Sequence, residues 1–179
     1  FCGAIAMTTF EIRPETRTDI PALNALSAAA FGPGRFARSA YRVREGIAPV
    51  ANLCLTAWEG AQIAGGVRFT AIRVGDRKGG LLLGPLVVDP ALVGKGCGKA
   101  LIESGLDRSQ KAGFGFVLLV GDMSYYRRFG FKACANGAIA LPGPVDPERI
   151  LGVELSEGAL QGATGLVSAY AASVREPVY

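Results

Sequence analysis

The residues with the clearest chemical potential form a glycine-rich turn between an apolar segment and a stretch with helical spacing. The turn reads VGKGCGK over 93–99, and the apolar segment before it runs from Leu81 to Val88. Glycines let the backbone approach a ligand closely, and the first N–H groups of a helix lack partners within the helix. These N–H groups and the helix dipole attract anions. The turn therefore predicts a site for the phosphates of a nucleotide cofactor.

Two common phosphate-binding patterns do not fit this turn, and a third does. A P-loop requires GxxxxGK[ST], but Val93 stands where its first glycine is needed and Ala100 where Ser or Thr is needed. A dinucleotide fingerprint requires GxGxxG, and its third glycine would fall on Lys99 or Leu101. The pattern [QR]xxGx[GA] fits 93–98 at every position but the first. In this respect the turn resembles the pyrophosphate loop of the GCN5-related N-acetyltransferase (GNAT) superfamily.

The resemblance to this family extends over four ordered motifs between Leu81 and Phe131. They are the strand LLLGPLVVDP, the turn GKGCGKALI, the strand GFGFVLLVG and the closing YYRRFGF. The remaining tail is similar to a bacterial branch of uncharacterised predicted N-acetyltransferases. The resemblance implies an α/β fold with a mixed sheet. That sheet would be mostly antiparallel, with a splayed parallel strand pair and flanking helices.

The resemblance also implies acetyl-CoA or coenzyme A as the cofactor, together with the residues that hold it. Leu86, Val87 and Val88 would lie beside the pantetheine arm and lend it backbone hydrogen bonds. A backbone N–H of Val87 or Val88 would also polarise the thioester carbonyl. The pyrophosphate would be wrapped by Val93, Gly94, Lys95, Gly96, Cys97, Gly98 and Lys99. Val93 replaces the usual Gln or Arg, which takes away one polar contact but leaves the backbone N–H groups in place.

Tyr126 occupies the position where this family commonly has a tyrosine that protonates the departing thiolate of coenzyme A. A phenol suits that role because it stays protonated at neutral pH and can return a proton to a thiolate. The alternative is an amphipathic core tyrosine, and we favour the acid. Tyr125 is expected to face the acceptor or to pack. The place that often carries Asn in this family reads Asp122 here, and a general base is not evident, since Asp89 and Glu59 are typical turn or surface carboxylates.

The surrounding pattern supplies the elements that must position these residues. Alternating apolar residues predict strands over 10–13, 53–59, 63–74, 81–88 and 151–155, and a continuous apolar run predicts a buried strand over 116–120. Helical spacing predicts helices over 19–31 and 98–112. Pro85 interrupts its strand, because proline cannot donate to a ladder. It indicates either a simple sheet edge or a gap where a ligand pairs with freed backbone groups.

Length and pattern favour one domain over 9–179, with a core over 9–134 and C-terminal strands over 135–179. Residues 1–6 are expected to be an extension or remnant. Two segments, Phe31 to Gly46 and Ala135 to Arg149, are candidates for acceptor selectivity, although the first also has the composition of solvated surface. Neither segment carries a recognisable substrate code.

Composition excludes several classes of function. The net charge of +4 is too small and scattered for nucleic-acid binding, and no apolar run could span a membrane. The chain has no histidine, and Cys2, Cys54, Cys97 and Cys134 lie far apart, so we predict no metal site and a reducing cytoplasm. Cys97 either packs as a small hydrophobe or is activated by the helix N-terminus, and we favour packing.

Together these features predict an acetyl-CoA-dependent N-acyltransferase in which an amine attacks the thioester directly within a ternary complex. The acceptor would be the amine of a small molecule or of a protein. A non-catalytic module that binds or senses acyl-CoA is the alternative. A Rossmann-type nucleotide binder is disfavoured by the missing third glycine and the antiparallel first half. A homodimer paired through the last strand is compatible with the pattern.

Overall fold

The computed structural model describes residues 8–34, 38–135 and 137–172, so the predicted extension over 1–6 lies outside the described residues. In this part of the chain the strands form one sheet in the order β1-β2-β3-β4-β5-β8-β6, with β9 beside β3 and β7 beside β9. Their bounds are Glu11–Pro14 (β1), Leu55–Glu59 (β2), Gln62–Val74 (β3), Arg77–Val88 (β4), Phe116–Val120 (β5), Lys132–Ala133 (β6), Ile139–Ala140 (β7), Ile150–Glu154 (β8) and Gly165–Ala169 (β9).

Most neighbouring strands are antiparallel, as the resemblance implied. The exceptions among the described residues are the parallel pair β4–β5 and the short parallel pair β7–β9. The β4–β5 pair arises because α3 (Cys97–Lys111) carries the chain back across the sheet between the two strands. The mixed α/β sheet with a splayed parallel pair is therefore confirmed.

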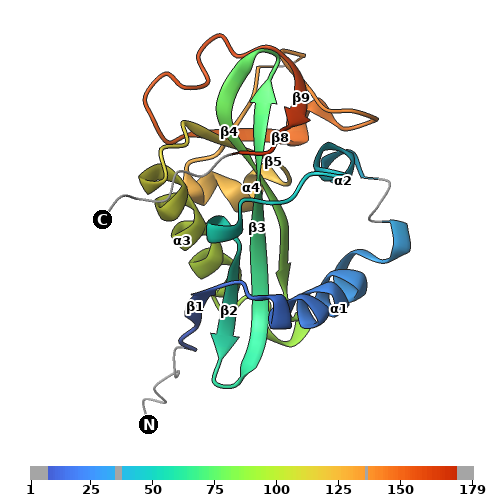
Figure 1. Cartoon of the computed structure of the whole chain (residues 1–179), viewed down its shortest axis with the longest axis vertical. Helices are drawn as coiled ribbons and strands as arrows, with labels where there is room; N and C mark the ends of the chain where they lie inside the picture. Colours follow the sequence, from blue (N-terminus) through green and yellow to red (C-terminus); the bar gives the residue numbers. More distant parts are fainter. Residues whose placement is uncertain (1–7, 35–37, 136, 173–179) are drawn as a thin grey trace.

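Helices cover both faces of this sheet (Figure 1). The helix α3 lies on one face, and α1 (Ile20–Phe31) and α2 (Ser39–Arg44) lie toward the other. Successive residues of β3 face opposite sides of the sheet. A Cβ at Gly65 would lie 3.1 Å from the Cys97 sulfur of α3, and a Cβ at Gly66 would lie 2.6 Å from Leu23 of α1. Glycine at these two positions lets both helices approach the sheet backbone closely.

The predicted elements agree with the structure in place and type, with one difference in packing. The face of α3 that carries Leu101, Ile102 and Ser109 is buried, as its periodicity predicts. The apolar face of α1 is different, because Leu23 is its only fully buried residue. The strand β9 lies within 135–179, where the sequence predicted C-terminal strands but did not locate this one.

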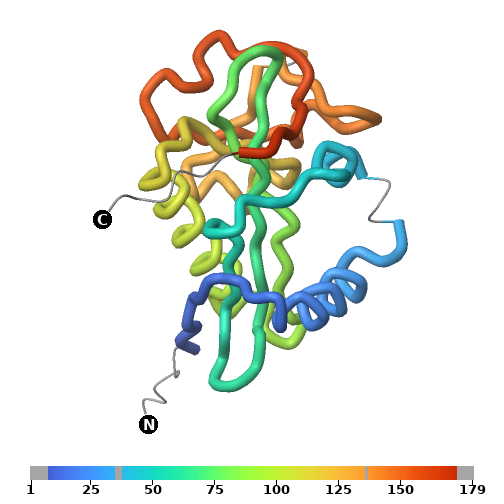
Figure 2. The backbone as a smooth tube through the Cα atoms, viewed as in Figure 1, coloured from blue at the N-terminus to red at the C-terminus, as the bar shows by residue number. Residues whose placement is uncertain are grey.

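The C-terminal part of the described chain closes over one end of the sheet. In Figure 2 this segment, drawn orange to red, wraps around the end of the β3–β4 hairpin. The Gly75 N–H in that hairpin turn donates to the Leu166 carbonyl of β9 at 3.0 Å.

The strand β8 has β5 along its whole length on one side and β6 on the other at Leu151 and Gly152. Pairing with a second copy through β8 would have to use its short remainder, and the homodimer stays a prediction. None of the helices in the described ranges has the length and hydropathy needed to cross a membrane.

Candidate active site

The site begins where β4 and β5 separate. The two strands pair only over Gly80–Leu82 and Phe116–Leu118, and both continue beyond the last pair. On the other side of β4, the register with β3 shifts between Val67 and Phe69, so that Gly84 and Pro85 together oppose the single residue Arg68. Two residues facing one is the arrangement of a β-bulge, which bends the strand. Pro85 thus lies in a bulge at the point of divergence rather than at a simple sheet edge.

Backbone groups of β4 beyond this point face the opening. Asp89 donates its N–H to the Ala64 carbonyl of β3 at 2.7 Å. Facing pairs in an antiparallel ladder alternate between hydrogen-bonded and non-bonded pairs, so Val87 is the next residue bonded to β3. Leu86 and Val88 therefore direct their N–H groups away from β3, into the opening left by β5. Of the two N–H groups suggested for the thioester carbonyl, this alternation favours Val88 and disfavours Val87.

The glycine-rich turn leads directly from this strand into α3. Gly94 has φ +81 and Gly96 has φ +93, conformations that residues with a side chain rarely adopt. Ala100 makes the first intrahelical bond, to the Gly96 carbonyl at 3.0 Å. The N–H groups of Cys97, Gly98 and Lys99 come before that bond and have no intrahelical partner. No atom lies within 4 Å of a Cβ built at Gly94 or Gly96, so the front of the turn is open to a ligand.

Side chains around the turn divide between packing and solvent. Val93 is 68% exposed and supplies no polar group at the position where the family pattern has Gln or Arg. Lys95 and Lys99 are exposed, and Lys99 lies 3.9 Å from Glu103. Cys97 is buried, and burial raises the pKa of its thiol to about 11. This agrees with a packing role for Cys97, because a reactive thiol at a helix N-terminus requires a lowered pKa.

Both tyrosines follow β5 on α4 (Met123–Tyr126), where the carbonyl of Asp122 accepts the N–H groups of both. The Tyr126 ring packs edge-on against Phe131, with ring centres 5.8 Å apart. The Tyr125 hydroxyl reaches the first turn of α3, since a Cβ at Gly98 would lie 2.6 Å from its oxygen. The two rings are themselves in edge contact at 4.9 Å. The Tyr125 hydroxyl therefore lies beside the glycine-rich turn, and both tyrosines line the cavity at the strand opening.

The environment keeps the Tyr126 phenol protonated. Burial raises the pKa of Tyr126 to about 12, and the nearby Tyr125 and Asp122 add to this effect. Burial also raises the pKa of Tyr125. Arg149 acts in the opposite direction on the pKa of Tyr126, and its Nε lies 3.4 Å from Asp122 Oδ1. At neutral pH the Tyr126 phenol is thus a donor of a hydrogen bond and not a base.

A cavity of about 1150 Å³ extends from the opening between β4 and β5 toward α1 and α2. Its walls include the face of α1 that carries Asn24, Ser27 and Phe31, the helix α2 with the segment after it, Arg68 and Thr70 of β3, the bulged part of β4, the end of β5, and the loop over 144–146. Tyr125 and Tyr126 line it from the far side of the opening, and the turn over 93–99 does not line it. The cofactor turn and the cavity are therefore separate compartments that meet at β4.

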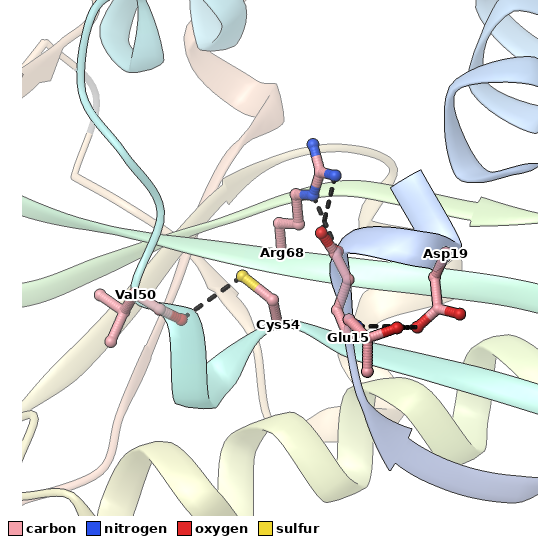
Figure 3. A network of polar contacts seen from close by, with 6 residues as sticks. Glu15, Asp19, Val50, Cys54 and Arg68 are labelled. Carbon is pink, nitrogen blue, oxygen red and sulfur yellow. Dashed lines mark hydrogen bonds and ion pairs between the residues drawn. The ribbon is translucent and has the colours of Figure 1, made fainter. Parts of the chain in front are cut away.

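Four arginines line the cavity: Arg38 and Arg149 are exposed, whereas Arg44 and Arg68 are half-buried and differ in their partners. Arg68 donates from Nε and Nη2 to the two carboxylate oxygens of Glu15 at 2.9 and 2.8 Å (Figure 3). Arg44, at the end of α2, donates from Nε to the Ala40 carbonyl at 3.1 Å. Its Nη1 is buried without a hydrogen-bond partner among the described residues. Burial lowers the pKa of Arg44 to about 10, and Arg68 contributes to that lowering.

Neither carboxylate considered as a base lies in the cavity. Asp89 accepts the Ala91 N–H at 2.9 Å and so caps a short turn. Glu59 is the last residue of β2 and lies beside the turn that joins β2 to β3. The acidic residues that line the cavity are Glu45, Asp122 and Asp146, and all three are exposed. The sequence analysis singled out none of these three as a base.

Known proteins are similar to this chain in sequence and in fold. A model of the acetyltransferase (GNAT) family matches residues 21–131, which is more than half of the chain. The chain belongs to this family. It is similar to an uncharacterised N-acetyltransferase of Escherichia coli, YhbS, with 32% identity over 157 residues that cover 87% of this chain and 93% of that protein. The resemblance noted in the sequence is therefore confirmed.

Solved structures of two GNAT proteins are similar to this fold over most of its length. The crystal structure of E. coli YhbS in complex with CoA has a TM-score of 0.76 and 29% identity, covering 90% of this chain and 89% of that one. A GNAT acetyltransferase from Brucella melitensis in complex with acetyl-CoA has a TM-score of 0.61 and 31% identity, covering 82% and 96%.

The structure brings most of the predicted site residues together. Leu86 and Tyr126 line the cavity at the opening between β4 and β5, and the turn 93–99 follows β4 outside the cavity lining, so that cofactor binding by these residues stays a prediction. Sequence reasoning missed Arg44, Arg68 and Glu15. The segment from Phe31 to Gly46 was considered as an acceptor wall, and Arg44 lies within it. No local signal in the sequence links Glu15 with Arg68.

Proposed function

We propose that this protein transfers an acetyl group from acetyl-CoA to an amine by direct attack within a ternary complex. The observation that carries the proposal is the juxtaposition at the β4–β5 opening. Free N–H groups of β4 and the residue Tyr126 border this opening, and the unpaired N–H groups at the start of α3 follow β4 along the chain. A cavity for the second substrate adjoins that gap. Family membership and relatives solved with CoA and acetyl-CoA support the same proposal.

Each part of the site has a task in this reaction. The turn 93–99 holds the pyrophosphate with backbone N–H groups, and Leu86 to Val88 align the pantetheine arm. The N–H of Val88 donates to the thioester oxygen as negative charge develops there. The amine nitrogen bonds to the carbonyl carbon, and the bond from that carbon to sulfur breaks. Tyr126 gives its proton to the leaving sulfur and regains one released by the amine nitrogen.

This scheme needs no acyl-enzyme. Catalysis comes mainly from holding both reactants in line and from preorganised donors at the thioester oxygen. Cys97 is buried and has a raised pKa, so it is unsuited to accept the acetyl group. Free thiols at Cys54, Cys97 and Cys134 suit the reducing cytoplasm that we infer for this enzyme. The acceptor amine would enter through the cavity between α1, α2 and β4.

Calorimetric titration with acetyl-CoA, CoA, ATP and NAD tests the cofactor directly. The wild type should bind the two CoA species saturably and neither ATP nor NAD with similar affinity. A Gly96→Glu variant should lose CoA binding, because a carboxylate there meets the pyrophosphate with bulk and with like charge. Gly113→Glu is the matched control. Gly113 also has positive φ and open surroundings, but it lies at the opposite end of α3.

Two results would overturn the proposal. One is a preference for NAD or ATP over CoA, which would assign the turn to another nucleotide. The other is equal loss of CoA binding in both glycine variants, which would mean that strain in α3, and not contact at the turn, removes binding. CoA binding without turnover of any amine would support the alternative of a non-catalytic acyl-CoA sensor.

A further inference from the structure

The cavity beside β4 is lined by a guanidinium, that of Arg44, which pairs with no carboxylate of the described residues, although its Cζ lies 6.0 Å from the centre of the Tyr41 ring. The guanidinium of Arg44 uses Nε to bond the Ala40 carbonyl of its own helix at 3.1 Å. Its Nη1 is buried and has no hydrogen-bond partner in the part of the chain that the structure describes. Buried polar groups in folded proteins are nearly always hydrogen-bonded, and buried charges are nearly always paired. An exception inside a cavity that borders a reaction site calls for a ligand.

The carboxylate nearest to this region is already occupied. Both oxygens of Glu15 accept from Arg68, in a two-pronged ion pair whose Glu15 side chain is only 10% exposed. Arg44 and Arg68 are close enough that Arg68 lowers the pKa of Arg44. Glu15 thus pairs with Arg68, and Arg44 has no corresponding carboxylate among the described residues.

The exposed acids around the cavity do not supply the missing partner. Asp122 lies 3.4 Å from Arg149, and Asp146 accepts the Glu148 N–H at 3.0 Å. Glu45 follows Arg44 in the chain, but its side chain is exposed and makes no ion pair with Arg44 in the described structure. Arg44 thus lines the cavity without pairing with any of the acids that line it in the described structure.

Arg44 is also placed close to the expected thioester. Its Nη1 would lie 3.5 Å from a Cβ at Gly84, which is in the bulge where β4 leaves β5. Val88, whose N–H is assigned to the thioester oxygen, is four residues further along the strand, a span of about 13 Å. A planar guanidinium fork matches a carboxylate with two parallel hydrogen bonds. One small molecule can therefore reach both the guanidinium and the reacting carbonyl.

We infer that Arg44 binds a carboxylate of the acyl acceptor, so that the preferred acceptors are amino acids or similar molecules with an amine and a carboxylate close together. This inference rests on the proposed acetyltransferase function and specifies its substrate class. A carboxylate on the acyl group, as in succinyl-CoA, has the same chemistry and could reach the same guanidinium. The experiment must therefore distinguish an anionic acceptor from an anionic acyl donor.

The test uses sets of matched acceptors: each amino acid, its amide and the corresponding decarboxylated amine, with acetyl-CoA as the donor and CoA release as the readout. Hydrogen bonds to a charged group predict that kcat/KM for the acid exceeds that for the amide by about 10- to 100-fold. Arg44→Gln should reduce this ratio to about one while leaving the affinity for CoA unchanged. Arg38→Gln is the matched control, because Arg38 lines the same cavity from an exposed position.

Binding of the expected products gives a second readout that does not depend on turnover. CoA-loaded protein is titrated calorimetrically with N-acetyl amino acids and with their amides, in the wild type and in Arg44→Gln. The acids should bind more tightly than the amides in the wild type only. A third arm compares succinyl-CoA with acetyl-CoA in the wild type and in Arg44→Gln, using propylamine as an acceptor without a carboxylate.

The possible outcomes separate this inference from the proposed function. Absence of CoA binding in the wild type would overturn both. Normal CoA binding with equal use or equal binding of acids and amides would overturn only the role of Arg44. A preference for acids over amides that persists in Arg44→Gln, or that is lost equally in Arg38→Gln, would also overturn the role of Arg44. An Arg44-dependent preference for succinyl-CoA, without a preference among acceptors, would move the carboxylate to the acyl donor and refute an anionic acceptor.

Discussion

Replacing the two cavity arginines by methionine should change the stability of the free protein in opposite directions. Methionine keeps much of the apolar stem of arginine and removes the charge. Arg44→Met loses one hydrogen bond to the Ala40 carbonyl, worth about 0.5–1.5 kcal/mol. It also removes a buried donor without a partner, whose burial costs about 1–3 kcal/mol. We therefore expect the free energy of unfolding to stay constant or to rise by up to about 2 kcal/mol.

Arg68→Met removes one partner of an ion pair and leaves the other in place. Breaking a fully buried pair in this way costs about 3–5 kcal/mol, because the remaining charge stays desolvated. The side chains of Arg68 and Glu15 are 25% and 10% exposed, so solvent screens part of that cost. We expect a loss of about 2–3 kcal/mol. The gap between the two variants should then be at least about 2 kcal/mol, which corresponds to roughly 4–8 °C in Tm for a chain of this size.

Urea unfolding at pH 7, followed by far-ultraviolet circular dichroism without ligand, measures this difference. Midpoints are compared at a shared m-value, since a change in m would indicate a change in the unfolded or native ensemble. Equal destabilisation by Arg44→Met and Arg68→Met would refute the reasoning. It would mean that the Arg44 charge has a stabilising partner in the free protein and is not held ready for a ligand.

Three further predictions concern the tyrosines and the thiols. Tyr126→Phe should lower kcat by about 100-fold or more at unchanged CoA affinity, as loss of a general acid does, whereas Tyr125→Phe should lower it far less; steady-state kinetics and calorimetry decide this. Burial raises the pKa of Cys54 and Cys97 from 9.0 to about 11. The contribution of these buried thiols to stability is therefore complete below pH 9 and is lost as the pH rises to about 11. Urea unfolding midpoints measured over this pH range test the expected loss. Iodoacetamide at pH 8 should leave Cys97 of the folded protein unmodified, and peptide mass spectrometry would refute its packing role if it were alkylated.

The parts of the fold that the sequence predicted are those encoded by short-range pattern. The turn over 93–99 contains its own signals, because Gly94 and Gly96 need positive φ and the helical spacing begins at once after them. The strand over 116–120 is apolar at every position and is central in the sheet, as such runs usually are. Pro85 correctly marked an irregularity, and the register with β3 shows it to be a bulge.

The parts that the sequence could not predict depend on contacts between distant segments. Glu15 and Arg68 are 53 positions apart, and nothing in their neighbourhoods indicates that they pair. The burial of Arg44 depends on α2 lying over the bulge of β4, and a six-residue helix has too little periodicity to predict that packing.

The helix α1 shows how a correct periodicity can lead to a wrong expectation of burial. Its apolar face was predicted from the spacing of residues over 20–31, and the helix forms as expected. Only Leu23 on this face is fully buried, because Ser27 and Phe31 line the cavity instead of packing against the sheet. Local and global preferences often disagree at functional sites. An amphipathic helix whose apolar face remains open is thus itself a sign of an acceptor cavity.

The divergence of β4 from β5 creates both compartments of the site from one strand. Before the bulge, β4 is bonded on both sides and is part of the core. At the bulge, Gly84 brings the backbone next to Arg44, and beyond it Leu86 and Val88 turn their N–H groups toward the cofactor side. One rigid element thus carries the proposed donors for the thioester and supports Arg44, the proposed anchor for the acceptor. Arg44 itself comes from α2, so changes in α2 can alter acceptor preference while the cofactor strand stays the same.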